Sequence, residues 1–279
     1  MLTPQQQQQY QVDGYLVLPG FKTPDELATL RERAGQIVAA FDANSHRSVF
    51  SSSDQARRAA GADFLASAEG IQCFFEEEAF DAHGALRQAK ALSINKIGHA
   101  LHDLDPVFER FSRNTALAGL AADLGLQDAK LWQSMYIFKQ PGIGGEVKWH
   151  QDASFFDTTP STVTAFWFAL EDATLDNGCL WVQPGGHRGP LRERFIREGD
   201  AVRMQALDST PWPDQTTAVP VPVKAGTLIC FHGQLPHYSA PNRSAVSRHA
   251  YTLHATSGHA HYAARNWLQR GAANPVRGF

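Results

Sequence analysis

Cysteine is scarce in this chain, and long apolar runs are missing. Only Cys73, Cys179 and Cys230 occur, widely spaced and without a CxxC pair. This excludes a disulfide framework and predicts a reducing compartment. The most prominent apolar run, Val163–Leu170, is far shorter than the ~20 residues that cross a bilayer. The N-terminus has neither the basic nor the apolar region of a signal peptide. We therefore expect a cytoplasmic protein without membrane association.

A strong charge of one sign is also missing. The net charge is −3 and the sequence pI is near 6.4, which argues against a dedicated nucleic-acid binder. With 43% hydrophobic and 19% charged residues, the chain is too apolar to be disordered. Its 279 residues can bury a core large enough to enclose a small-molecule site. Because no repeat or linker divides it, residues 1–279 are predicted to form one domain.

The first 125 residues are predicted to be mostly helical. Helix-start signals occur at Thr3-Pro4 and at Thr23–Glu26, with a short strand between them at Tyr15–Leu18. Residues 43–70 show no steady period, which indicates a long connection of the kind that often serves as a lid or is mobile. Residues 93–124 return to helical spacing, marked by Leu101, Leu104, Val107 and Phe111.

Residues 126–279 have the pattern of an all-β structure. Short β-branched or aromatic runs are separated by turns rich in Gly, Pro, Asn and Asp, a spacing typical of a sandwich or barrel. The runs are LWQSMYIFK, VTAFWFAL, GCLWVQ, TAVPVPV, GTLICFH and AYTLHA. A helical N-terminal part is therefore expected to flank a β core.

His150-Gln151-Asp152 is the most informative motif. In an extended strand, residues i and i+2 point to the same face, so His150 and Asp152 can approach one ion. A bare HxD is equally compatible with a hydrogen-bonded turn. However, His237 follows Asp152 by 85 residues, after an apolar strand. Together the three residues fit the 2-His-1-carboxylate triad of non-haem Fe(II) enzymes.

Arg248 follows His237 by 11 residues. A guanidinium can make two parallel hydrogen bonds to a carboxylate, as an anchor for 2-oxoglutarate requires. On its own, Arg248 is equally a surface arginine. His232 is a rival metal ligand, and Arg243, in a predicted turn, is a rival anchor. His187 is interpreted as fixing a turn.

These residues resemble the phytanoyl-CoA dioxygenase family of Fe(II)/2-oxoglutarate oxygenases. The similarity covers nearly the whole chain and includes DGYLVLPGF, SINKIGHALH, QSMYIFKQP, HQDASF, EDATLDNGCLW and GTLICFHGQLPHYSAPNRSAVSR. It implies a double-stranded β-helix (a jelly-roll, cupin-like core) with flanking helices. It also implies Fe(II) held by His150, Asp152 and His237, and 2-oxoglutarate held by Arg248. Further co-substrate contacts are implied for Lys96, Met135, Trp167 and Ser239, although Met135 and Trp167 could be core residues and Lys96 a solvated helix lysine.

The implied activity is hydroxylation of a small molecule by dioxygen, coupled to decarboxylation of 2-oxoglutarate. Asp152 distinguishes this pattern from that of related halogenases, in which a small residue replaces the carboxylate. Two alternatives stay open: a cupin-like Zn hydrolase or isomerase using the same three ligands, and a jelly-roll binding module without catalysis. The substrate and the oligomeric state cannot be derived. The basic stretch Arg188–Arg197 is interpreted as a solvated face rather than a coenzyme A site, because Glu193 interleaves it.

Overall fold

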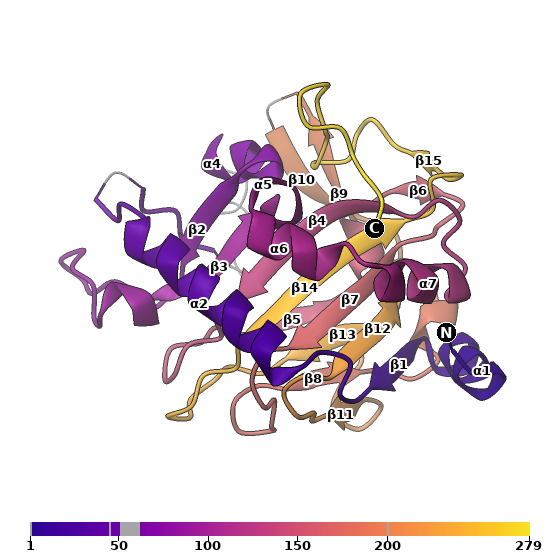
Figure 1. Cartoon of the computed structure of the whole chain (residues 1–279), viewed down its shortest axis with the longest axis horizontal. Coiled ribbons are helices and arrows are strands. Elements are labelled where there is room, and N and C mark those ends of the chain that lie inside the picture. Colours follow the sequence, from indigo (N-terminus) through magenta and orange to yellow (C-terminus); the bar gives the residue numbers. More distant parts are fainter. Residues whose placement is uncertain (1, 45, 51–61, 200) are drawn as a thin grey trace.

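The computed structural model describes residues 2–44, 46–50, 62–199 and 201–279. It is mainly β, with two stacked antiparallel sheets and helices packed outside them (Figure 1). The helices are α1 (Pro4–Asp13), α2 (Pro24–Ala40), α4 (Ala62–Ala66), α5 (Leu101–Leu104), α6 (Pro106–Ser112) and α7 (Thr115–Asp123). The strands are β1 (Tyr15–Leu18), β2 (Ile71–Phe75), β3 (Ile94–His99), β4 (Lys130–Ile137), β5 (Val147–His150), β6 (Thr158–Thr159), β7 (Thr164–Ala169), β8 (Leu180–Val182), β9 (Glu193–Glu198), β10 (Ala201–Ala206), β11 (Val219–Val221), β12 (Leu228–His232), β13 (His237–Ser239), β14 (Ala250–Thr256) and β15 (His261–Tyr262).

The larger sheet has the strand order β1-β12-β7-β14-β4-β3-β2. Alternate residues of its strands serve two different cores, as the two-residue period of a strand requires. On β7, Phe166 and Phe168 face an outer core shared with α2, α6 and α7, whereas Ala165 and Trp167 face the other sheet. Figure 1 shows α2 and α6 lying across this outer face. The helices therefore leave the inner face free for a site.

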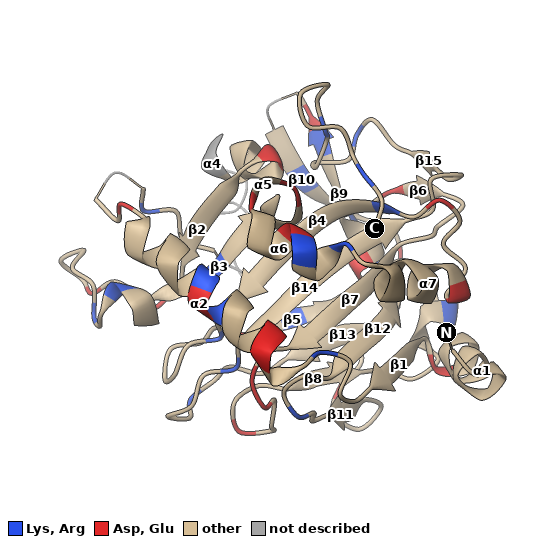
Figure 2. Cartoon of the chain, in the orientation of Figure 1, with Lys and Arg blue, Asp and Glu red and all other residues tan. Residues whose placement is uncertain are grey.

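The smaller sheet, with the order β11-β8-β13-β5, covers that inner face. Leu180 and Val182 of β8 pack with Trp167 and with Ile229 of β12 in a second apolar core. This pair of sheets is the jelly roll that the spacing of apolar runs predicted, and all six predicted runs contain strands. Strands β7, β12 and β14 carry few charged residues. Most Lys, Arg, Asp and Glu residues lie on helices and loops instead (Figure 2).

The two predicted helix starts are confirmed. Thr3 and Thr23 each cap a helix with their side chains. The side-chain oxygens of Gln6 and Glu26 accept a hydrogen bond from the backbone N–H of the cap residue. Such reciprocal capping satisfies backbone N–H groups that a helix leaves unpaired at its start. Among the described residues, no helix combines the length and apolar character that would let it cross a membrane. The three cysteines are buried and free.

The prediction of helix from residue 93 onward was wrong at its start. Residues 94–99 form β3, and helix begins only at Leu101. Leu104, one of the apolar residues that marked this helical spacing, is 48% exposed. The N-terminal part is therefore more than a helical flank, because β1, β2 and β3 belong to the larger sheet. Of the long connection predicted at 43–70, residues 45 and 51–61 lie outside the described residues, and α4 occupies part of the rest.

A third apolar cluster extends from the larger sheet to segments outside both sheets. It joins Phe64 of α4, Phe195 of β9, Val202 of β10 and Trp267 of the C-terminal segment. Strands β9 and β10 form a separate two-stranded sheet. This cluster extends the apolar surface of the cavity described next.

Candidate metal centre and co-substrate site

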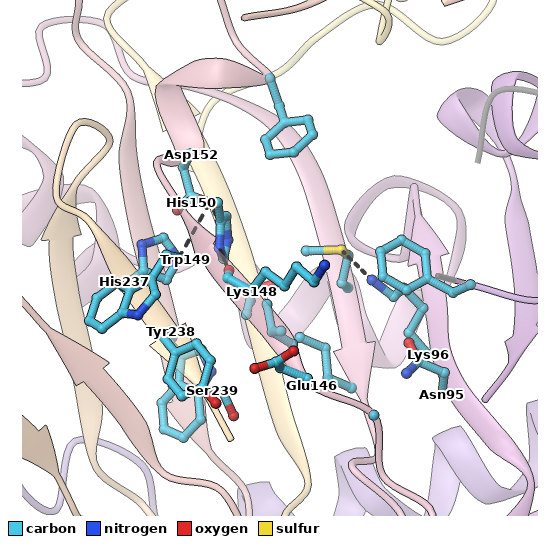
Figure 3. A pocket seen from close by; sticks show the side chains of 18 of the residues that line it. Asn95, Lys96, Glu146, Lys148, Trp149, His150, Asp152, His237, Tyr238 and Ser239 are labelled. Atoms are coloured by element: carbon cyan, nitrogen blue, oxygen red, sulfur yellow. Dashed lines mark hydrogen bonds and ion pairs between the residues drawn. The ribbon is translucent and has the colours of Figure 1, made fainter. Parts of the chain in front are cut away.

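His150, Asp152 and His237 meet between the ends of β5 and β13. The two strands pair with His237 opposite His150, and Asp152 begins a short 3-10 helix directly after β5. Nε2 of His150 and Nε2 of His237 each lie 3.7 Å from Oδ1 of Asp152. One ligand atom from each residue lies within 4.8 Å of the others. Figure 3 shows the three side chains converging on one side of a pocket.

The backbone between the ligands is extended, as the HxD spacing requires. Gln151 has φ −126° and ψ 129°, so its side chain points away from His150 and Asp152. It is fully buried, and its amide donates to Pro190 O (3.1 Å) and Gln234 O (2.8 Å) and accepts from Arg192 N (3.0 Å). These hydrogen bonds of Gln151 therefore fix the backbone between His150 and Asp152.

Backbone carbonyls orient both histidine rings. Nδ1 of His150 lies 2.8 Å from Lys148 O, and Nδ1 of His237 lies 2.9 Å from Leu235 O. A carbonyl only accepts, so each Nδ1 is the donating nitrogen, and each Nε2 faces Asp152. Burial opposes ionisation of Asp152, but His254, His237 and His150 lower its pKa below the usual value. Two imidazoles and one carboxylate are a suitable donor set for a divalent transition metal.

Sequence reasoning missed His254, which also contacts Asp152. Its Nε2 lies 3.2 Å from Oδ2 of Asp152, and its ring stacks on Phe156. His254 is 4% exposed and lies on β14. The signal that could have found it is the spacing along this strand, since Thr252 and His254 line the same cavity. Imidazole nitrogens thus lie near both carboxylate oxygens of Asp152.

Arg248 lies in the same cavity and is 1% exposed. Its guanidinium lies 5.3 Å from the Trp167 ring, and Nη2 is 3.5 Å from Oγ of Ser239. Its Nε and Nη1 are buried and have no hydrogen-bond partner among the described residues. Burial lowers the pKa of Arg248 to about 10, so the group is still charged at neutral pH. A buried cation with two unused donors is suited to a carboxylate ligand.

Two further charged groups, also missed from the sequence, surround this end of the cavity. Nζ of Lys139 donates to Gly145 O (2.6 Å) and to Ser239 O (3.3 Å). Oε2 of Glu76 accepts from Asn95 Nδ2 (2.7 Å) and from Gly145 N (3.1 Å). Burial lowers the pKa of Lys139 and raises that of Glu76. They fix the backbone around Ser239 and Gly145.

The other predicted co-substrate residues line the same cavity of about 570 Å³. Lys96 lies on β3, not on a helix, and its Nζ is 3.1 Å from the Phe50 ring centroid and 3.9 Å from Sδ of Met135. Figure 3 places Lys96 across the pocket from the metal-ligand candidates. The structure thus brings together every predicted site residue: His150, Asp152, His237, Arg248, Lys96, Met135, Trp167 and Ser239.

The rival residues lie elsewhere. His232 accepts from Gln234 N at 3.1 Å, and burial lowers its pKa to about 4. His187 contacts Gln11 O at 3.2 Å, in the turn it was expected to fix. Arg243 pairs with Glu78 at 2.6 Å and is half-exposed. None of these three lines the cavity.

Known proteins are similar to this chain over most of its length. The model of the family described as phytanoyl-CoA dioxygenase (PhyH) matches residues 10–250. The chain belongs to this family. It is 46% identical over 238 residues to a phytanoyl-CoA dioxygenase of Arabidopsis thaliana, covering 85% of this chain and 83% of that protein. It is 45% identical over 245 residues to phytanoyl-CoA dioxygenase domain-containing protein 1 of Bos taurus, covering 85% of this chain and 84% of that protein.

Solved structures share the fold of this family member at low sequence identity. The non-heme alpha ketoglutarate dependent carbocyclase SnoK aligns with a TM-score of 0.64 and 17% identity, over 99% of this chain and 96% of SnoK. EctD from S. alaskensis, solved with 2-oxoglutarate and 5-hydroxyectoine, aligns with a TM-score of 0.60 and 23% identity, over 92% of this chain and 76% of EctD. These likenesses confirm the jelly-roll fold.

Proposed function

We propose that the protein is an Fe(II)- and 2-oxoglutarate-dependent dioxygenase that hydroxylates a small molecule. The observation that carries the proposal is one cavity holding both a His-Asp-His ligand set and a buried arginine with unused donors. The family supports dioxygenase chemistry. The epimerase SnoN, which shares the fold with a TM-score of 0.65, has been solved with Fe³⁺, alpha ketoglutarate and nogalamycin RO.

Each group has a defined task in this proposal. His150, Asp152 and His237 would hold Fe(II), leaving positions open for other ligands. When bound, the iron supplies the oxidation, in which dioxygen and 2-oxoglutarate give succinate and carbon dioxide and one oxygen atom enters a substrate C–H bond. Arg248 anchors the distal carboxylate of 2-oxoglutarate, beside Trp167 and Ser239. Lys96 and Met135 limit the space for the co-substrate.

The two alternative functions, a Zn hydrolase or isomerase and a binding module, do not account for all of the side chains found in the cavity. A Zn hydrolase or isomerase would use the three ligands and an activated water, with no requirement for a buried guanidinium. A binding module without catalysis would need neither the ligand set nor the orientation of both Nε2 atoms. Because an unpaired buried charge is unfavourable, Arg248 indicates that the cavity takes an anion.

An anaerobic titration tests the proposal without a known substrate. Metal-free protein receives Fe(II) and then 2-oxoglutarate, and we expect a visible charge-transfer band. The His237→Ala variant should lose the band because one metal ligand is missing, whereas His83→Ala, which changes an exposed histidine, should keep it. Fe(II) binding without a band would favour the zinc-type alternative.

Replacing His254 should weaken metal binding, because its contact with Oδ2 orients the Asp152 carboxylate. Groups that orient metal ligands typically contribute 10- to 100-fold to affinity. We expect a loss of about that size in His254→Leu and a smaller loss in His254→Gln, which keeps a donor. Calorimetry of Mn(II) binding to the metal-free protein measures the effect. His232→Leu is the matched control, and equal Mn(II) affinity in both leucine variants would contradict this role of His254.

A further inference from the structure

Thr252 lines the cavity and has no task in the function proposed above. It lies on β14 and is 4% exposed. Its hydroxyl oxygen is buried and has no hydrogen-bond partner among the described residues. Burying a hydroxyl without a partner is unfavourable, and valine would fill the same space without that cost. The hydroxyl of Thr252 therefore indicates an acceptor that binds in the cavity.

Strand pairing places Thr252 beside two residues that line the proposed co-substrate site. It lies directly opposite Trp167 of β7 on one side and opposite Met135 of β4 on the other. Side chains that lie opposite one another on adjacent strands point to the same face, with Cβ atoms about 5 Å apart. The three side chains therefore form one row across the inner face of the larger sheet, with Thr252 in the middle, and all three line the cavity.

Along the chain, Thr252 lies between the proposed anchor and the metal-ligand end of the cavity. Residues two apart in a strand share a face, and both Thr252 and His254 line the cavity. His254 contacts Asp152, with Nε2 3.2 Å from Oδ2. In the other direction, the guanidinium of Arg248 lies 5.3 Å from the ring of Trp167, the neighbour of Thr252 in the row. A ligand that reaches from Arg248 to the metal therefore passes the Thr252 hydroxyl.

The chemistry of 2-oxoglutarate matches a hydroxyl at this place. The molecule has a carboxylate at each end and an oxo group beside one of them, so at neutral pH it accepts hydrogen bonds and donates none. A threonine hydroxyl rotates freely and can donate to such an oxygen. Hydrogen bonds to a charged acceptor are shorter and stronger than those between neutral groups. Binding of 2-oxoglutarate would therefore give the Thr252 hydroxyl the acceptor that it lacks.

The neighbours of Thr252 in the row do not compete for its proton. The indole of Trp167 offers only a donor, and the thioether of Met135 is a weak acceptor. Another buried threonine of β14 is different, because Oγ1 of Thr256 accepts from Nε1 of Trp132 at 2.9 Å. Thr256 does not line the cavity. The hydroxyl of Thr256 is thus used inside the protein, whereas that of Thr252 faces the ligand.

We propose that Thr252 is a co-substrate residue whose hydroxyl donates a hydrogen bond to a carboxylate oxygen of 2-oxoglutarate. This inference rests on the proposed function, because it takes 2-oxoglutarate to be the ligand that Arg248 anchors. The two residues have different tasks. The charge of Arg248 attracts the carboxylate, and the neutral hydroxyl of Thr252 orients the bound molecule along β14, toward the metal-ligand candidates.

Exchange of the hydroxyl at constant side-chain shape tests the proposal. Thr252→Val keeps the shape and removes the donor, whereas Thr252→Ser keeps the donor and removes a methyl group. Calorimetric titration of the Mn(II)-loaded protein with 2-oxoglutarate gives the affinity of each variant. We expect Thr252→Val to bind about tenfold to a hundredfold more weakly than the wild type, because a hydrogen bond to a charged group is lost. Thr252→Ser should bind nearly as tightly as the wild type.

Two controls separate this role from a general effect on the strand or the metal. Thr256→Val removes a buried hydroxyl from the same strand outside the cavity, and should leave the 2-oxoglutarate affinity unchanged. Mn(II) affinity, measured without 2-oxoglutarate, should be the same in Thr252→Val and in the wild type. The Thr252 hydroxyl has no hydrogen bond to the metal-ligand candidates that its loss could disturb.

Three results would overturn the inference. The first is an unchanged 2-oxoglutarate affinity in Thr252→Val, in a titration that shows binding to the wild type. The second is an equal loss in Thr252→Val and Thr252→Ser, which would assign the effect to side-chain shape. The third is a weaker Mn(II) affinity in Thr252→Val, which would assign Thr252 to the metal site. Failure of the proposed function would be visible separately, as a wild-type protein that binds no 2-oxoglutarate.

Discussion

Replacing Asp152 with alanine is expected to lower the rate of 2-oxoglutarate decarboxylation by more than about 10³-fold while the protein stays folded. Metal catalysis supplies several kcal/mol of transition-state stabilisation, which corresponds to a rate effect of about this size. The fold should survive, because a buried carboxylate contributes little to stability on its own. Succinate formation measures the rate, and thermal unfolding measures the fold.

The matched control for this variant is Asp172→Ala. Asp172 is a partly exposed aspartate that pairs with Lys224 at the surface, away from the cavity. Its replacement should leave decarboxylation unchanged. If Asp152→Ala retained full coupled activity, the assignment of His150, Asp152 and His237 as the metal ligands would be wrong. A loss of the folded state in Asp152→Ala would instead show that this carboxylate is structural.

Replacing Arg248 with alanine is expected to weaken 2-oxoglutarate binding by two to three orders of magnitude, with Fe(II) still bound. Losing a buried, hydrogen-bonded charge pair costs about 2–5 kcal/mol. Arg248→Lys should fall between the wild type and Arg248→Ala, because an ammonium keeps the charge but not the paired donors. Calorimetric titration of the Mn(II)-loaded variants with 2-oxoglutarate gives the affinities.

Arg243→Ala serves as the comparison for the arginine variants. Arg243 is bound to Glu78 and to Gly142 O outside the cavity, so its loss should not change 2-oxoglutarate affinity. A weaker affinity in Arg243→Ala, together with a normal one in Arg248→Ala, would exchange the two assignments. Loss of Fe(II) binding in Arg248→Ala would show that this arginine supports the metal site rather than the co-substrate.

The β core could be predicted because its strands keep short apolar runs between turn residues. β3 could not, because almost all of its residues are buried and it therefore shows no alternation of apolar and polar residues. Its apolar positions merged with those of the following helices, where Leu104 kept the helical spacing although it is 48% exposed. Burial on both faces of a short strand removes the period on which such predictions depend.

The site divides in the same way. His150 and Asp152 could be paired from their spacing, since the two-residue period acts over a few residues of backbone. The contact of His254 with Asp152 could not be predicted in this way, because it depends on how β14 of the larger sheet packs against the end of β5 in the smaller one. The third apolar cluster is also hidden in the sequence: Phe64, Phe195 and Trp267 lie far apart along the chain and meet only through tertiary packing.

The placement of the third apolar cluster, which lines part of the cavity, has a consequence for how this protein can evolve. The metal-ligand candidates lie on or next to β5 and β13, and Trp167, Met135 and Lys96 lie on strands of the larger sheet. Phe64, Phe195 and Trp267 come from α4, the β9–β10 hairpin and the C-terminal segment, outside both sheets. Loops and added segments tolerate sequence change better than the strands of a core. Mutation or exchange of these outer segments could therefore produce descendants with new substrates while the inherited oxidation chemistry is kept.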